Sequence, residues 1–205
     1  MAQFDHKDFR IVEKIRTFQG YFAIDEYQIE HKLFNGGWSQ TFSRELFERG
    51  DASAVILFDP EREAVVLLEQ FRVGALNSEH SPWMIEIVAG IIEAGETSES
   101  VAIREAKEEA GQDIEQLEYI GKYYSTPGGS SESISLFCAR VDSSSAGGVF
   151  GLEHEQEDIR VFTMTLNEVE SGLNRGLIEN ATTIIAMQWL LLNHQRLKKQ
   201  WLIDN

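Results

Sequence analysis

One stretch of the chain, residues 90–112, has a density of glutamates that destabilises a helix unless a cation lies among them. Its spacing is Gly-x5-Glu-x7-Arg-Glu-x-x-Glu-Glu-x-Gly, and the positions that it fixes are Gly90, Glu96, Arg104, Glu105, Glu108, Glu109 and Gly111. At 3.6 residues per turn, Glu105 and Glu109 share a helix face and Glu108 lies on the same side. Like charges at this spacing repel one another. The segment therefore predicts a helix that holds a divalent metal ion.

The helix itself is predicted from Ser98 to Ala110. Thr97 or Ser98 can serve as its N-cap, and Gly111 suits the left-handed position that follows a helix. A separate stripe of mostly small apolar residues is expected to pack closely on a sheet: Ala102, Ile103, Ala106 and Ala110.

The residue types around this helix favour one kind of metal. Carboxylate oxygens with no His or Cys nearby favour Mg²⁺, with Mn²⁺ as an alternative, over zinc. Arg104 lies four residues before Glu108 and is expected to pair with it. A solvated acidic face is the competing interpretation, but such a face does not require Gly90, Gly95 and Glu96 ahead of the helix.

Composition limits the partners of the chain. Its 205 residues fit one large domain or a core with a smaller accessory piece, and the net charge of −16 argues against nonspecific nucleic-acid binding. An anionic substrate would need metal ions and local arginines to approach. The N-terminus is too polar for a signal peptide, and the apolar run at 184–192 is too short to span a bilayer. We therefore expect a soluble cytoplasmic protein without membrane contacts, with Cys138 as a buried thiol.

Strand patterns surround the predicted helix. Alternating or continuous apolar runs predict strands at 9–18, 21–33, 38–47, 52–58, 64–70, 83–88, 117–125, 133–141 and 159–165. Helical patterns follow at 166–173 and 181–201, and residues 143–148 are predicted to form a flexible loop. Ile184, Ile185, Trp189 and Leu192 lie at helical spacing and predict core or dimer packing. Strands and helices without strict alternation imply a mixed sheet with helices on its faces.

Residues 90–112 resemble the signature of the Nudix hydrolases, with Gln112 as the one departure, where the family has an aliphatic residue. The resemblance implies an α/β fold of the α/β/α sandwich type with a mixed sheet. It implies metal ligation by Glu105, Glu109 and the backbone carbonyl of Ala89, with Glu108 and Arg104 in catalytic support. It divides the chain into an N-terminal antiparallel β extension, residues 1–47, and a Nudix domain, residues 48–205.

Other segments resemble the ADP-ribose pyrophosphatase group of that family, over nearly the whole chain. The matching segments are 44–50, Glu69-Gln70-Phe71-Arg72, 127–132 and 155–160, and Pro127 lies near the group's marker position. By this resemblance the substrate-binding residues are Tyr21, Phe22, Arg44, Glu45, Arg72, Ile91, Thr126, Pro127, Gly128 and Glu132. Ordinary roles compete for some of them: a turn for Pro127, a surface ion pair for Arg72, and interface packing for Tyr21 and Phe22.

A glycine-containing acidic loop, residues 147–158, is predicted to supply the base that activates water. Glu155 is the base by resemblance, and Glu157 is a metal-associated carboxylate. The residue types alone do not separate Glu153, Glu155 and Glu157, and a solvated loop is the competing interpretation.

Taken together, these features predict a Mg²⁺-dependent enzyme that hydrolyses ADP-ribose to AMP and ribose 5-phosphate. The resemblance implies a homodimer in which the aromatic pair at 21–22 serves the partner's site. The alternatives are another Nudix hydrolase, acting on a nucleotide sugar or NADH, and a noncatalytic ADP-ribose sensor. The intact set of acidic residues, the acidic charge and the lack of length for a DNA-binding domain argue against the sensor.

Overall fold

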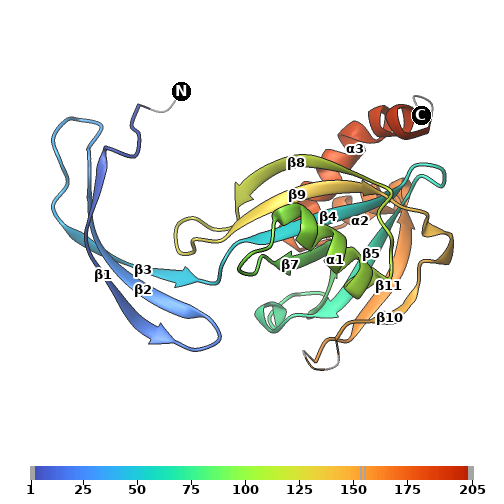
Figure 1. The fold of residues 1–205 in the computed structure, drawn as a ribbon, viewed down its shortest axis with the longest axis horizontal. Coiled ribbons are helices and arrows are strands. Elements are labelled where there is room, and N and C mark those ends of the chain that lie inside the picture. The colour runs from blue at the N-terminus through green and yellow to red at the C-terminus, as the bar shows by residue number, and fades with distance from the viewer. Residues whose placement is uncertain (1–2, 153, 155, 203–205) are drawn as a thin grey trace. The chain divides into compact units, whose positions relative to one another are not determined.

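A computed structural model describes residues 3–152, 154 and 156–202 of the chain (Figure 1). Its strands are β1 Phe9–Gln19, β2 Ala23–His31, β3 Phe42–Glu48, β4 Ala52–Asp59, β5 Ala64–Phe71, β6 Trp83–Glu86, β7 Val88–Ile91, β8 Gln116–Tyr124, β9 Ser133–Arg140, β10 Gly148–Phe150 and β11 Ile159–Thr165. Its α-helices are α1 Ser98–Ala110, α2 Leu166–Asn174 and α3 Ala181–Leu202, and short 3₁₀ turns cover Val73–Ala75 and Ser143–Ser145.

The predicted elements are present, with two differences. The strand expected at 83–88 is two strands, because β6 pairs with β5 whereas β7 pairs with β4. The residue between them, Ile87, donates its backbone N–H to Thr183 Oγ1 at 3.1 Å, which accounts for the break. The loop expected at 143–148 begins with a 3₁₀ turn and ends in β10, where Gly148 is opposite Val161.

Contacts divide the chain into two compact units. The smaller unit comprises the residues up to Asp51 together with Tyr124–Ser133, and the larger comprises Ala52–Tyr123 and the residues from Ile134 onward. Each unit is described by itself below.

The larger unit is built on a mixed sheet. Within the described residues its strand order is β10-β11-β5-β4-β9-β8, with β6 beside β5 and β7 beside β4. Strands β4 and β9 are parallel, whereas β5 and β7 are antiparallel to β4. The strands β4, β5 and β9 consist almost entirely of buried residues, as expected for strands covered on both faces.

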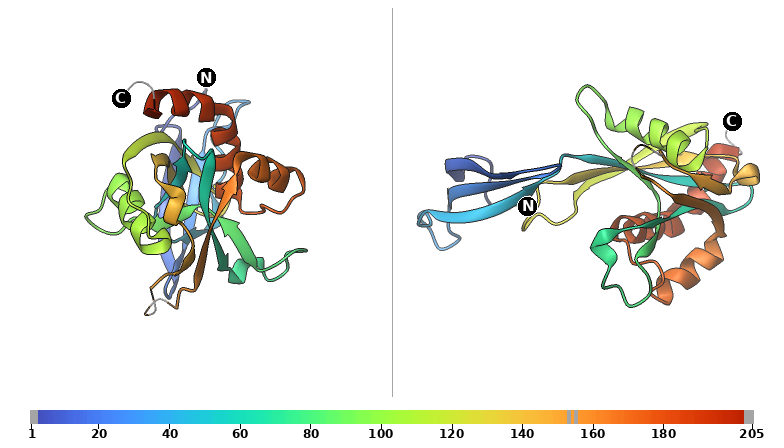
Figure 2. Two further views of the ribbon diagram at one scale, coloured as in Figure 1. Left: turned by 90° about the vertical axis from the view of Figure 1, so that its right-hand side faces the viewer. Right: turned by 90° about the horizontal axis from the view of Figure 1, so that it is seen from below.

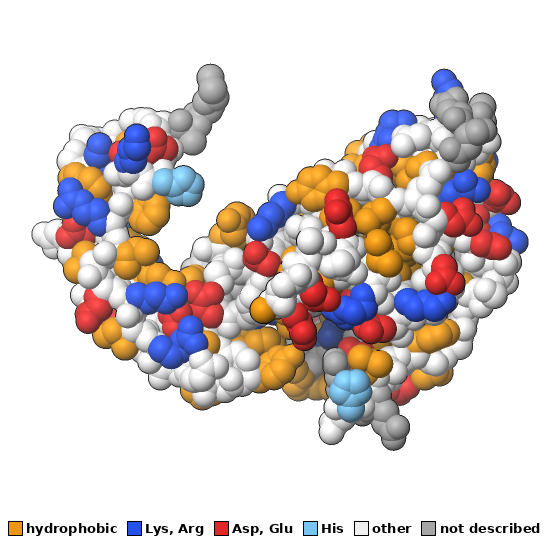
Figure 3. Space-filling view, viewed as in Figure 1, with side chains coloured by type: hydrophobic (Ala, Val, Ile, Leu, Met, Phe, Trp, Pro, Cys, Tyr) orange, Lys and Arg blue, Asp and Glu red, His pale blue; other side chains and the backbone are white. Residues whose placement is uncertain are grey.

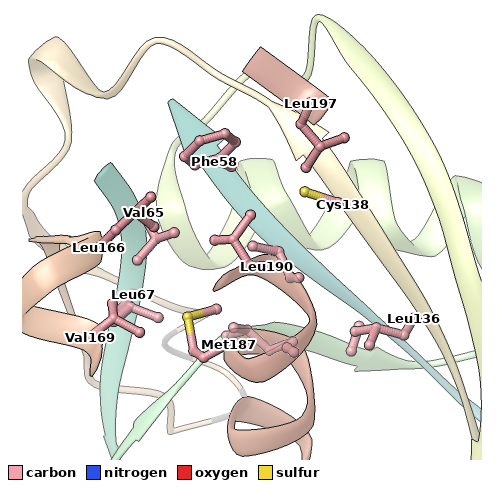
Figure 4. Packing of buried hydrophobic residues seen from close by; sticks show 14 of the residues in the cluster. Phe58, Val65, Leu67, Leu136, Cys138, Leu166, Val169, Met187, Leu190 and Leu197 are labelled. Carbon is pink, nitrogen blue, oxygen red and sulfur yellow. The ribbon is translucent and has the colours of Figure 1, made fainter. Parts of the chain in front are cut away.

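Helices cover both faces of this sheet, with α1 on one side and α2 and α3 on the other (Figure 2). Because successive strand residues point to opposite faces, Ile56 and Phe58 of β4 pack with α2 and α3 residues such as Leu190. Val55 and Leu57 pack with α1 instead. Figure 4 shows the first of these clusters, where Met187 and Leu190 of α3 lie against β4 and β5 side chains. This arrangement confirms the predicted α/β/α sandwich.

The alanine stripe of α1 packs as predicted, with one correction. Ala102, Ala106 and Ala110 are buried against the sheet, but Ile103 is 51% exposed and Val101 is buried in its place. The prediction for Ile103 was wrong: its spacing places it near Ala110 around the helix, but the sheet covers the opposite edge of the alanine stripe, where Val101 lies on the side of Glu105.

Helix α3 buries a different stripe from the one proposed from its spacing. Thr183, Ala186, Met187 and Leu190 are buried, together with Leu197 and Trp201. Ile184 and Trp189 contact the core only partly, whereas Ile185 and Leu192 are exposed. Among the described residues, no helix combines the length and apolar character needed to cross a membrane.

The smaller unit contains the antiparallel sheet β1-β2-β3 that the N-terminal pattern predicted. Asp25 is fully buried in this sheet and pairs with Arg16 and with Lys14, whose Nζ is 2.9 Å from the carboxylate. The hydrogen bonds from Arg16 and Lys14 lower the pKa of Asp25 to about 2. The segment 124–133 joins the unit through β3, where Phe47 donates its N–H to the carbonyl of Gly129 at 2.8 Å.

Candidate active site

Helix α1 has defined ends that fix its glutamates in place. At the start, Thr97 Oγ1 accepts from the N–H of Ser100, and Ser100 Oγ accepts from the N–H of Thr97, at 3.1 and 3.0 Å. At the end, Gly111 has φ of +65° and its N–H bonds back to Lys107 at 3.1 Å. The N-cap choice left open between Thr97 and Ser98 is therefore Thr97, and the predicted role of Gly111 is confirmed.

Arg104 forms ion pairs with three glutamates of the 90–112 segment. Its guanidinium lies 2.9 Å from Glu96, 2.8 Å from Glu105 and 2.8 Å from Glu108. The expected pairing of Arg104 with Glu108 is present. These carboxylates, Glu96 first, raise the pKa of Arg104, so the guanidinium stays charged. Arg104 therefore orients the outer part of the acidic cluster. Acidic and basic side chains also lie next to one another over the face of the molecule seen in Figure 3.

Glu109 is the innermost carboxylate of the helix. It is 4% exposed, and its Oε2 accepts the N–H of Ala89 on β7 at 3.1 Å. Burial, followed by the negative charge of Glu105, raises the pKa of Glu109 well above its ordinary value. A buried carboxylate beside a second carboxylate is unfavourable in its charged form unless a cation compensates it.

Glu105 lies directly over β7. A Cβ placed on Gly90 would come 1.8 Å from Glu105 Oε1, so only glycine leaves room for the carboxylate in this position. Burial raises the pKa of Glu105, against the opposing effect of Arg104. The glycine at the start of the sequence pattern therefore brings the carboxylates of α1 against the backbone of Ala89 and Gly90.

Arg72 lies at the end of β5 and is paired with Glu86 of β6. Its Nε is 3.1 Å and its Nη2 2.8 Å from Glu86 Oε2. Burial opposes the charged form, but Glu86, followed by Glu109 and Glu157, raises the pKa of Arg72. Glu86 is 5% exposed. The surface ion pair considered for Arg72 is thus present, and it lies within electrostatic reach of Glu109.

The acidic loop contributes Glu157 to the same region. The charge of Glu157 raises the pKa of both Glu105 and Glu109. A tight turn holds this residue, since Leu152 donates its N–H to Glu157 Oε2 and accepts the N–H of Glu157, both at 3.3 Å. Glu153 and Glu155, two of the three glutamates considered as the base, lie outside the described residues.

This constellation offers oxygen donors suited to a hard cation. The donors are the carboxylates of Glu105 and Glu109 beside the backbone of β7. Burial first, and neighbouring carboxylate charge as well, raise their pKa values, and a bound cation would offset both effects. Within the part of the chain that the structure describes, no group of three or more acidic, His or Cys side chains lies close enough together to hold a metal ion. Magnesium fits this arrangement, because it is commonly held by one or two carboxylates and completes its shell with water and substrate phosphate.

The remaining predicted substrate residues lie in two places. Ile91, at the end of β7, is half-buried in the larger unit beside Gly90. Tyr21 and Phe22 form the turn between β1 and β2 in the smaller unit, with ring centroids 4.7 Å apart. Tyr21 is 87% exposed, whereas the ring of Phe22 packs on Phe47, with ring centroids 5.1 Å apart.

Strand β3 carries Arg44 and Glu45, both exposed. The segment Thr126–Glu132 is attached to the end of the same strand. Ser130 donates its hydroxyl to the carbonyl of Phe47 at 3.1 Å, and Arg49 lies 3.1 Å from the carboxylate of Glu132. Thr126, Pro127 and Gly128 form the exposed tip of this segment. Within the smaller unit, the predicted substrate residues of β3 and those of the segment 126–132 therefore lie on two stretches of chain that are hydrogen-bonded to each other.

The sequence interpretation did not single out Glu86. Its signal was weak, because an acidic residue within a short strand is ordinarily solvent-exposed. Its position between the apolar residues Ile85 and Ile87 was the available hint.

Comparison with known proteins agrees with this site. Residues 48–184 match the model of the NUDIX domain. The ADP-ribose pyrophosphatase of Escherichia coli (strain K12) is 42% identical over 198 residues, which cover 97% of this chain and 95% of the relative. The GDP-mannose pyrophosphatase of Cronobacter sakazakii is 37% identical over 155 residues, covering 73% and 78% of the two chains.

A solved structure shares the fold. The crystal structure of an ADP compounds hydrolase superposes with a TM-score of 0.68 at 19% identity, covering 95% of this chain and 96% of the other. The domain match, the identity over nearly the full chain and the shared fold show that this protein belongs to the NUDIX family.

Proposed function

We propose that this protein is a Mg²⁺-dependent hydrolase that cleaves the pyrophosphate bond of ADP-ribose and releases AMP and ribose 5-phosphate. The observation that carries the proposal is the placement of Glu105 and Glu109 of α1 against the backbone of Gly90 and Ala89. The similarity to an ADP-ribose pyrophosphatase over 97% of the chain supports the choice of substrate.

The proposed metal ligands are Glu105, Glu109, Glu157 and the carbonyl of Ala89. When bound, Mg²⁺ supplies charge neutralisation on the phosphoryl oxygens; Mn²⁺ is the alternative ion. Arg104 would hold Glu108 and Glu105 in orientation, as its contacts at 2.8 Å support. Arg72 would bind the diphosphate, for which a planar guanidinium is well suited.

In the proposed reaction, a water oxygen bonds to one phosphorus while the bond from that phosphorus to the bridging oxygen breaks. The departing phosphate carries away the bridging oxygen. Glu155 is the proposed acceptor of the water proton, and Glu108 the proposed supporting carboxylate.

The smaller unit would bind the adenosine and terminal ribose. Arg44, Glu45, Thr126, Pro127, Gly128 and Glu132 are its proposed contacts within one chain, and Ile91 of the larger unit is a further proposed substrate contact. Tyr21 and Phe22 would stack on adenine in the partner's site of a homodimer, and the exposure of Tyr21 supports a role that a monomer leaves unused. The proposed location is the cytoplasm.

The metal assignment is tested with Glu109→Gln and Glu105→Gln at saturating Mg²⁺. Losing a residue that merely supports a ligand typically reduces activity about 10–100-fold, so each substitution should lower kcat by roughly 100-fold or more. Glu99→Gln, in the first turn of the same helix, is the matched control and should retain wild-type turnover. Near-wild-type turnover in both active-site variants would refute the metal assignment.

The substrate is tested by parallel assays with ADP-ribose, GDP-mannose and NADH. ADP-ribose should give the highest kcat/KM. A higher value for GDP-mannose would favour the nucleotide-sugar alternative. Binding of ADP-ribose without any hydrolysis would indicate the noncatalytic sensor. Performing the reaction in ¹⁸O-labelled water identifies the attacked phosphorus, because only one of the two products then carries the label.

A further inference from the structure

Arg72 is held by more than its ion pair with Glu86. Its backbone N–H donates to the carbonyl of Pro82 at 2.8 Å, and its carbonyl accepts the N–H of Ala75 at 2.9 Å. Nε and Nη2 of the side chain donate hydrogen bonds to Glu86, and Nη1 forms no hydrogen bond within the described residues. Because the side chain is 45% exposed, part of this charged group stays accessible to a ligand.

Glu86 has a second partner, from the other end of the chain. Asn180 Nδ2 donates to Glu86 Oε1 at 2.9 Å, and Arg72 donates to both carboxylate oxygens, with Nη2 at 2.8 Å from Oε2. Glu86 is 5% exposed, so water does not readily replace a lost partner.

Asn180 is also the residue that caps α3. Its Oδ1 accepts the N–H of Thr183 at 3.0 Å, which is the bond made by an N-cap side chain. Thr183 in turn accepts the N–H of Ile87, next to Glu86, at 3.1 Å. The first turn of α3 therefore fixes both the side chain of Glu86 and the backbone beside it.

We propose that Glu86 and Asn180 are positioning residues that fix the guanidinium of Arg72 toward the diphosphate of the substrate. The amide of Asn180 has two separate tasks: its oxygen caps α3, and its nitrogen orients Glu86. This inference rests on the proposed function, which names the diphosphate as the ligand of Arg72. The hydrogen bonds among Arg72, Glu86 and Asn180 do not depend on which ligand binds.

The two tasks can be separated by substitution. Asn180→Ser keeps a good N-cap but removes the donor to Glu86, and Asn180→Asp keeps the cap while placing a carboxylate next to Glu86. Both variants keep the cap, so a fall in their melting temperatures reports the lost bond to the buried Glu86, and the fall should be larger in Asn180→Asp, where two carboxylates meet. Asn180→Ala loses both tasks and should melt below Asn180→Ser, so the difference between these two variants reports the cap.

The first readout needs no substrate. In ¹⁵N NMR spectra the Nε–H signal of Arg72, assigned by its absence in Arg72→Lys, should shift in Asn180→Ser and shift further or broaden in Asn180→Asp. An unchanged signal in both variants would overturn the positioning role, whatever reaction the protein performs.

The second readout uses ADP-ribose and a double-mutant cycle. Asn180→Ser should raise KM about 10-fold, the scale expected for a residue that orients a ligand-binding group, with a smaller change in kcat. In the Arg72→Ala background the same substitution should have no further effect, because nothing is left to position. A wild-type KM in Asn180→Ser, or equal effects in both backgrounds, would overturn the inference. Absence of ADP-ribose hydrolysis by the wild type would instead refute the proposed function and leave the NMR result to decide the positioning role.

Discussion

Glu105 can lie over β7 because Gly90 of that strand has no Cβ. Gly90 has no unusual backbone requirement, but its Cα faces the carboxylate so closely that any side chain would displace it. Conformational freedom is therefore not the reason for glycine here. The residue provides space for a carboxylate against the backbone.

Gly90→Ala should reduce activity strongly while changing stability little. The Cβ would meet the flexible end of Glu105, which can move aside, but the carboxylate then leaves its place beside Glu109. We expect kcat to fall by roughly 10–100-fold, as for loss of a group that orients a metal ligand. Gly121→Ala is the matched control, because a Cβ there meets nothing within 4 Å. Equal activities of the two variants would contradict the role given to Gly90.

Glu109 should destabilise the metal-free protein at neutral pH. Burial and the charge of Glu105 raise its pKa in the folded state, so the folded protein binds a proton more tightly than the unfolded chain. The free energy of unfolding therefore falls as the pH rises from the unfolded pKa near 4.3 toward the higher folded value.

Removing that charge reverses the effect. In EDTA at pH 7 to 8, Glu109→Gln should melt above the wild type, measured by differential scanning calorimetry. Added MgCl₂ should raise the melting temperature of the wild type but not of the variant, because only the wild type keeps the binding carboxylate. A variant that melts below the wild type in EDTA would show that Glu109 is compensated within the protein.

Among the secondary-structure elements, α1 has well-capped ends, but the glutamates between them repel one another. Thr97 and Ser100 satisfy each other's backbone donors, and Gly111 closes the other end. The glutamates between them repel, apart from those paired with Arg104. The caps and the buried alanines therefore stabilise a helix whose acidic face alone would weaken it.

Thr97→Ala should lower the free energy of unfolding by about 1 kcal/mol, the usual cost of losing an N-cap. Thr97→Ser keeps the capping oxygen and should stay within a few tenths of a kcal/mol of the wild type. Urea unfolding followed by circular dichroism measures both. A loss as large in Thr97→Ser as in Thr97→Ala would show that the methyl group, and not the capping oxygen, matters.

At the scale of the whole molecule, a buried carboxylate ties distant parts of the larger unit together. Asp59, at the end of β4, accepts the N–H and hydroxyl of Ser143 at 2.9 and 2.7 Å. It also accepts the N–H groups of Glu61 and Arg62 at 2.9 and 3.0 Å. Burial alone would raise the pKa of Asp59, but the bonds from Ser143 and Arg62 outweigh it and lower the pKa.

This linkage gives a defined pH dependence. A lowered folded pKa stabilises the protein above the unfolded value of about 3.9, and the contribution is lost as the pH falls through the folded pKa. Asp59→Asn should cost about 1–3 kcal/mol at pH 7, and the difference from the wild type should shrink below about pH 4. Asp113→Asn, in an exposed ion pair, is the control and should change stability by less than about 1 kcal/mol. Constant destabilisation from pH 7 to pH 3 would contradict the linkage.

The sequence by itself determined the family, the helix with its caps and most of the strands. Local signals suffice for these, because capping residues, glycines and apolar periodicity act on their immediate neighbours. The resemblance to the Nudix hydrolases and the α/β/α sandwich are confirmed. The division of the chain at residue 47, the homodimer and the individual substrate contacts stay predictions.

Only the tertiary structure decided which residues meet. It brought Glu86 of β6 to Arg72 and Asn180, before α3, to Glu86, and no period in the sequence relates these three positions. It also exposed Ile103, which helical spacing had assigned to packing on the sheet, because burial depends on which face of the helix meets the sheet. The glutamate-rich segment predicts a cation site by local repulsion, but Arg72, Glu86 and Asn180 belong to three separate parts of the chain, and only folding places them in one hydrogen-bonded series.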